Sequence, residues 1–177
     1  MTSKLTLSLA EAKLFESGLT LADAKLLGLT FHDDLSVLHK QADQAEWRAG
    51  PGIKIPYFDL LGQPLETHPS WGPFWRTRRL EVPQEERSGF DKQTTGGPIA
   101  GVKKADHKYD QPPKTGTTAY FPPNLDWPSI AMDPEQSIIL TEGEFKAMKS
   151  GKEGVPCIGL GGVWNYKSTE TGVLFLQ

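Results

Sequence analysis

Two carboxylates flank a glycine directly after a short apolar segment. Residues 137–140 (Ser-Ile-Ile-Leu) have the β-branched composition of a strand, and Glu142-Gly143-Glu144 follows within two positions. A carboxylate at the carboxyl end of a strand in an α/β fold lies in the crevice where phosphates and metals bind. The same pattern fits a plain strand-to-helix turn, in which both glutamates stabilise the first turn of the helix as anions. Local spacing leaves both interpretations open.

Basic residues concentrate in the middle of the chain. Residues 71–114 hold nine Lys and Arg against six Asp and Glu, whereas residues 1–70 hold six against nine and residues 115–177 hold four against seven. Aromatic and basic residues interleave in Trp71-Gly-Pro-Phe-Trp-Arg-Thr-Arg-Arg79. Such clusters suit phosphate backbones and unstacked bases. A charged, solvated strand edge gives the same pattern, so this interpretation also stays open.

Composition bounds the class of protein. The chain has 177 residues, a net charge of −3 and one cysteine, Cys157, which excludes an internal disulfide and suits a reducing compartment. No apolar run reaches membrane-spanning length, so we expect a cytoplasmic protein without a membrane partner. His32 and His39 stand alone in the sequence, and a zinc site needs three or four convergent ligands.

The first part of the chain predicts a helical hairpin over residues 8–28. Ser8 and Glu11 have capping-box spacing, Gly18 ends the first helix, and Thr20 with Asp23 starts the second. The apolar stripe expected on the first helix is Leu9, Ala12, Leu14 and Phe15. Residues 30–50 are ambiguous, and Leu35, Val37 and Leu38 within them fit either a strand or a helical turn.

Strands and turns follow. Residues 53–59 alternate in polarity, meet a turn at residues 61–64, and are expected to pair with residues 74–80 as an antiparallel hairpin. Residues 82–107 lack periodicity and predict a long loop. A short strand is expected at residues 118–121, and a linker around Trp127.

The last part predicts a parallel βαβ unit, with strands at residues 137–140 and 155–159 and a helix at residues 144–150. The glycine-rich turn of residues 159–162 is either plain turn chemistry or a phosphate contact. We therefore predict an α+β fold with a helical region (1–50), a small antiparallel β subdomain (51–125) and an incomplete α/β unit (126–177).

The order of these segments resembles a known family. The segments that carry the resemblance are residues 52–63, 74–78, 108–114, 119–123, 139–147 and 154–164. In this order they are similar to the amino-terminal primase-like domain of unknown function found on primase–helicase and replication proteins of plasmids and phages. They resemble, more distantly, the core of bacterial DnaG-type primases, in which a basic β subdomain precedes a metal-dependent toprim domain.

The resemblance implies roles for particular residues. Glu142 matches the acidic catalytic residue that ends the first toprim strand, with Gly143 after it, and is expected to act near bound Mg²⁺ or as the group that handles the proton of the attacking hydroxyl. Gly161 and Gly162 match a turn beside the active site. Lys108 and Tyr109 match a motif that contacts nucleotide or template. Basic residues expected to hold the polyanion are Arg76, Arg78, Arg79, Lys103, Lys104 and Lys108, and strand alternation sends Arg76 and Arg78 to one face and Arg79 to the other.

The sequence differs from the toprim pattern in one feature that matters for metal binding. Toprim domains add an Asp-x-Asp pair on a later strand, and the only acids after Glu142 are Glu144, Glu153 and Glu170. A single carboxylate is a poor Mg²⁺ site, so Glu144 is the candidate second oxygen ligand. The resemblance therefore implies that these residues are part of a longer protein or a remnant of one, with little or no catalysis of their own.

The resulting expectation is the amino-terminal part of a DNA primase-type nucleotidyltransferase that binds single-stranded DNA and nucleotides for Mg²⁺-dependent primer synthesis, with a helicase domain or protein as a further partner. One alternative is a non-catalytic nucleic-acid-binding module of a replication protein. The other is a toprim nuclease.

Overall fold

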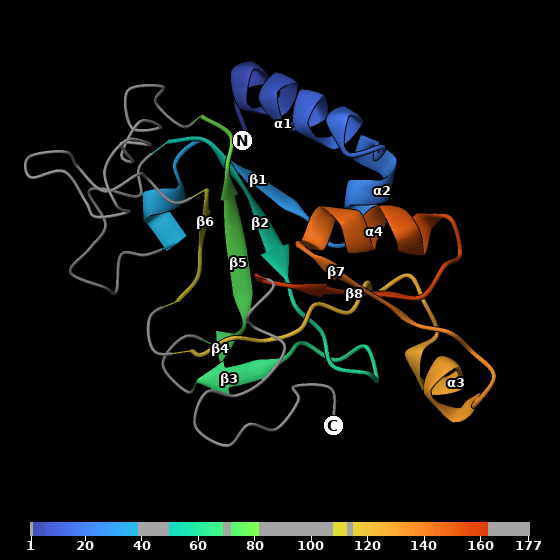
Figure 1. Ribbon diagram of the computed structural model, residues 1–177. Helices are drawn as coiled ribbons and strands as arrows, with labels where there is room; N and C mark the ends of the chain where they lie inside the picture. The colour runs from blue at the N-terminus through green and yellow to red at the C-terminus, as the bar shows by residue number, and fades with distance from the viewer. Residues whose placement is uncertain (1, 39–49, 69–71, 82–107, 113–114, 163–177) are drawn as a thin grey trace, which may run out of the picture.

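A computed structural model of the chain describes residues 2–38, 50–68, 72–81, 108–112 and 115–162. Figure 1 shows two N-terminal helices, an antiparallel sheet of four strands and a parallel pair of strands joined by a helix. The fold is therefore α+β, as the sequence predicts.

The N-terminal hairpin consists of α1 (Lys4–Glu16) and α2 (Leu21–Leu26). Ser3, whose side chain accepts a hydrogen bond from the Thr6 backbone N–H, caps α1. The prediction that the helix starts at Ser8 is wrong, because Ser8 lies inside it. Gly18, with φ of 72°, ends α1, and the predicted capping box of Thr20 and Asp23 starts α2.

The buried face of α1 also differs from the predicted stripe. Thr6, Ala10 and Leu14 are buried at a spacing of four residues, whereas Phe15 is 82% exposed. Of the predicted stripe only Leu14 lies in the core. Because α1 packs against two strands, the small side chains of Thr6 and Ala10 bring its backbone close to the sheet.

The antiparallel sheet has the strand order β1-β2-β5-β6. Its strands are β1 (Thr30–His32), β2 (Gly52–Pro56), β5 (Trp75–Arg79) and β6 (Tyr109–Asp110). Lys54 lies opposite Thr77, which confirms the predicted hairpin. The turn after β2 has φ of 75° at Gly62 and is held by Asp59, whose carboxylate accepts from two backbone N–H groups.

Three short elements complete this half of the molecule. A 3-10 helix, η1 (Leu35–Leu38), follows β1, and β3 (Glu66–His68) pairs with β4 (Gly72–Pro73). The predicted strand at residues 118–121 is reduced to one bridge, in which Tyr120 and Gly159 exchange both backbone hydrogen bonds.

The predicted βαβ unit is confirmed. Strands β7 (Ile139–Glu142) and β8 (Cys157–Leu160) are parallel, and α4 (Glu144–Lys152) connects them. The linker expected around Trp127 is instead a short helix, α3 (Trp127–Met132), capped by Asp126. The Trp127 indole is buried and donates to the Pro122 carbonyl, and these local bonds allow a helix to form there.

The described residues form two hydrophobic clusters, of which the smaller contains Trp127 and the larger joins α1, β2 and α4. The larger cluster contains side chains of α1 (Leu14), β2 (Ile53 and Ile55) and α4 (Phe145 and Met148). The boundaries predicted at residues 50 and 125 stay a prediction, and the long loop expected over residues 82–107 lies outside the described residues. Within the described ranges, no helix is long and apolar enough to cross a membrane.

Shortening a buried side chain of α4 is expected to destabilise the whole described structure. Met148 is fully buried, so Met148→Ala should lower the free energy of unfolding by about 2–5 kcal/mol through the cavity it leaves. Met132→Ala is the control, because Met132 is 83% exposed in α3 and its loss should cost less than about 0.5 kcal/mol. Urea unfolding measures both, and equal losses would contradict a core shared through α4.

Candidate functional site

The candidate site begins where β7 ends. Glu142 is the last residue of β7, its side chain is exposed, and Leu160 of β8 lies opposite it in the parallel register. Gly143 follows with φ of 88°, a conformation that glycine adopts without strain, and α4 starts at the next residue. Glu142 is thereby held at the carboxyl edge of the parallel pair, as the sequence predicts.

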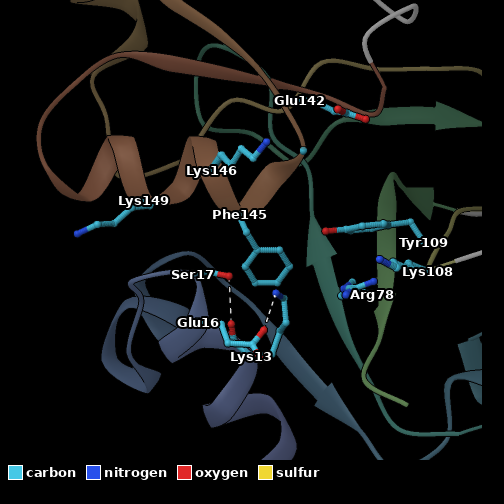
Figure 2. Close-up of a pocket in the computed structure, with 11 residues that line it drawn as sticks. Lys13, Glu16, Ser17, Arg78, Lys108, Tyr109, Glu142, Phe145, Lys146 and Lys149 are labelled. Atoms are coloured by element: carbon cyan, nitrogen blue, oxygen red, sulfur yellow. Dashed lines mark hydrogen bonds and ion pairs between the residues drawn. The ribbon is translucent and has the colours of Figure 1, made fainter. Parts of the chain in front are cut away.

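A cavity of about 670 Å³ lies at this edge (Figure 2). Its lining comes from α1, β5, β7, α4 and the residues that start β6, and consists of Lys13, Glu16, Ser17, Arg78, Lys108, Tyr109, Glu142, Gly143, Phe145, Lys146 and Lys149. Five of these side chains are cationic and two are carboxylates, so the cavity favours an anion. It brings together Glu142, Arg78, Lys108 and Tyr109 from distant parts of the sequence.

Two arginines of β5 lie against one tyrosine of β6. The guanidinium carbons of Arg76 and Arg78 are each 5.0 Å from the centre of the Tyr109 ring, which confirms that both side chains are on the same face of the strand. Burial, together with the nearby charge of Glu144, raises the pKa of Tyr109 to about 12. The phenol is therefore neutral at physiological pH, and its ring holds both cations by cation–π attraction.

Arg78 has hydrogen-bonding capacity to spare. Its Nε and Nη1 atoms are buried and have no hydrogen-bond partner among the described residues. Each of these two atoms carries an N–H group that can donate a hydrogen bond to an oxygen of a phosphate or carboxylate. Buried donors without a partner cost free energy, and because Arg78 lines the cavity, an oxyanion bound there is a candidate partner for its guanidinium.

The other residues predicted to bind ligand are not found among the described residues that line the cavity. Arg79 is buried and does not line the cavity, and neither do Gly161 and Gly162. Lys103 and Lys104 lie outside the described residues. The binding roles predicted for all five of these residues stay predictions.

Glu144 is buried beneath the site. Its side chain is 1% exposed, and its Oε1 accepts hydrogen bonds from the Tyr57 hydroxyl, at 2.7 Å, and from Arg76 Nη1. Burial and the charge of Glu144 raise the pKa of Tyr57 well above its ordinary value, so Tyr57 remains a donor. Burial alone would lower the pKa of Arg76, but Glu144 raises it above its usual range.

These contacts tie the two halves of the fold together, because Tyr57 and Arg76 belong to the antiparallel half and Glu144 is the first residue of α4. The sequence gives no sign of this junction. Its partners are 87 and 68 residues from Glu144 along the chain. The arrangement also fixes the position of the start of α4, and with it the position of Glu142 two residues earlier.

The described residues do not complete a Mg²⁺ site. They contain no group of three or more His, Cys, Asp or Glu side chains able to hold a metal ion. The predicted metal role of Glu144 stays a prediction, but Arg76 and Tyr57 already occupy its Oε1. We therefore derive no chemical step through a metal from these residues.

Several lining residues were not predicted. Lys146 and Lys149 are three residues apart on α4, and helical periodicity applied to residues 144–150 would have placed them on one side, following Glu142. Lys13, Glu16 and Ser17 carry no local signal, because their place at the cavity depends on how α1 packs against the rest of the fold.

Comparison with known proteins gives one match. A family model described as a domain of unknown function, DUF3854, matches residues 126–173, a stretch that includes α3, β7, α4 and β8. Searches of curated proteins and of solved structures found no match. The matched stretch contains Glu142 and Glu144 but not the basic strand β5.

Removing one partner of the buried ion pair is expected to be costly. Arg76→Met leaves Glu144 as an uncompensated buried charge and should lower the free energy of unfolding by about 3–5 kcal/mol. Arg78→Met is the matched control, because Arg78 contacts the same tyrosine ring from the same strand but has no carboxylate partner among the described residues. Chemical denaturation of both variants checks this, and a loss for Arg78→Met as large as that for Arg76→Met would refute it.

Proposed function

We propose that this chain is the nucleic-acid- and nucleotide-binding part of a DNA primase-type nucleotidyltransferase of a replication protein. The cavity between β5, β7 and α4 binds phosphate groups of single-stranded DNA or of a nucleotide. Glu142 is the acidic residue at its edge. A helicase partner, a cytoplasmic location and Mg²⁺ dependence of the intact enzyme belong to the same proposal.

One observation carries the proposal: Arg78 lines a cavity together with four lysines, and two donor atoms of its guanidinium have no hydrogen-bond partner among the described residues. Phosphoryl transfer depends on cations that hold the phosphates in place and stabilise charge as it develops. The position of Glu142 beside these cations, at the carboxyl end of a parallel strand, supports a reacting site at this edge.

A second candidate is a non-catalytic nucleic-acid-binding module. It is favoured by the absence, within the described ranges, of a cluster of three potential metal ligands. The cavity would then bind the polynucleotide through charge and Glu142 would have no chemical role. A toprim nuclease, which would use the same glutamate for hydrolysis, ranks below both, because the basic sheet ahead of Glu142 is the primase-like arrangement.

Binding of single-stranded DNA tests the site. Lys146→Gln is expected to weaken binding of a fluorescein-labelled oligothymidylate at low salt and to reduce the slope of log K against log salt by about 0.7, the value for one lost phosphate contact on a single strand. Lys25→Gln is the matched control, since Lys25 is an exposed lysine of α2 that does not line the cavity. Fluorescence anisotropy over a salt series measures both, and no binding by the unmodified chain would reject the proposed function.

Glu142→Gln separates the two candidates. In the natural protein that contains this chain, the primase proposal expects primer synthesis on a single-stranded template to fall at least about 100-fold, the usual scale for a group that acts in the chemical step. Binding of oligothymidylate should be unchanged or slightly tighter, because one negative charge leaves the cavity. Primer synthesis that survives the substitution would contradict a catalytic Glu142, and no synthesis by the unmodified protein would favour the binding module.

A further inference from the structure

The N-terminal hairpin is fixed to α4 at one end of the cavity. Lys152 Nζ lies 2.8 Å from Asp23 Oδ2 and donates to the Gly18 carbonyl at 3.3 Å. Hydrogen bonds from Lys152 and Thr20 lower the pKa of Asp23 to about 2, so this pair is charged at neutral pH. The side chain of Lys149 covers the turn, because a Cβ added at Gly18 would lie 2.9 Å from Lys149 Cε.

The last turns of α1 face the cavity from this anchored position. Lys13 Nζ lies 5.8 Å from the centre of the Phe145 ring of α4 and 3.1 Å from Glu16 Oε2. Figure 2 shows Lys13 and Glu16 below this ring, with Glu142 at the far end of the view. Both α1 residues line the cavity, on the side away from the carboxyl end of β7.

The five cationic side chains of the cavity differ in whether they have a carboxylate partner. Arg78, Lys108 and Lys146 have no carboxylate partner among the described residues. Lys13 is paired with Glu16 of the same helix, and Lys149 with Glu153, the C-cap residue of α4. Exposed pairs of this kind are weak, and Glu16 is 69% exposed, so an incoming phosphate can replace it as the partner of Lys13.

We infer that α1 forms a further wall of the anion-binding cavity, in which Lys13 contacts a phosphate of the bound strand and Glu16 competes with that phosphate for Lys13. Glu16 is thereby a regulatory residue of the site, since its negative charge weakens binding both by holding Lys13 and by repelling the ligand. This inference rests on the proposed function, because it concerns the same cavity and the same class of ligand.

Four single variants of one helix test it by anisotropy with a labelled oligothymidylate. Lys13→Gln is expected to weaken binding roughly threefold to tenfold at low salt and to reduce the salt slope by about 0.7. Glu16→Gln is expected to tighten binding roughly twofold to fivefold. Lys4→Gln and Glu11→Gln are the matched controls, because both residues are exposed on α1 and do not line the cavity.

The double variant Lys13→Gln/Glu16→Gln isolates the competition. If Glu16 acts through Lys13, Glu16→Gln should tighten binding clearly less in the Lys13→Gln background than in the unmodified chain. Equal gains in both backgrounds would contradict the claim that Glu16 competes with phosphate for Lys13. An effect of Lys13→Gln equal to that of Lys4→Gln would contradict the claim that α1 forms a wall of the cavity. Either contradiction leaves the proposed function intact as long as Lys146→Gln weakens binding. If the unmodified chain does not bind the oligothymidylate, both the inference on α1 and the proposed function fail.

Discussion

The buried carboxylate of Glu144 is the contact on which the rest of the site depends. It accepts hydrogen bonds from Tyr57 and Arg76 in an interior where an unpaired carboxylate would be costly. These bonds join the antiparallel sheet to the first turn of α4, and the shared hydrophobic core closes around them. Attraction between the buried Glu144 and the partly buried Arg76 therefore sets how the two halves of the molecule meet.

This junction explains why the candidate site has its particular composition. Arg76 is used internally as the partner of Glu144, while Arg78, two residues further along the same face of β5, lines the cavity. Likewise Glu144 is internal and Glu142 is exposed at the end of β7. Arg76 and Glu144 thus form the ion pair that fixes the geometry, while Arg78 and Glu142, each two residues away along the chain, line the cavity. Tyr109 aligns both arginines, and because it is neutral it adds no negative charge.

Local patterns predicted much of the fold. The βαβ unit, the hairpin of β2 with β5 and the turns at Gly18 and Gly62 follow from periodicity and glycine placement, which act over a few residues. The start of α1 was misplaced because Ser3 and Ser8 are both acceptable caps, and tertiary packing decides between them. Of the site residues predicted from the sequence, the cavity brings together Glu142, Gly143, Arg78, Lys108 and Tyr109. The role of Glu144 and the contribution of α1 depend on contacts between distant segments, which a single sequence does not encode locally.

The central claim is that the junction at Glu144 presents Arg78 and Glu142 to one phosphate-binding cavity. An experimental structure of the chain with a bound oligothymidylate tests it most directly. The account predicts a phosphate oxygen at about 2.7–2.9 Å from a guanidinium nitrogen of Arg78, with the ion pair between Glu144 and Arg76 intact. A strand bound on another face, with no phosphate near Arg78, would contradict the account.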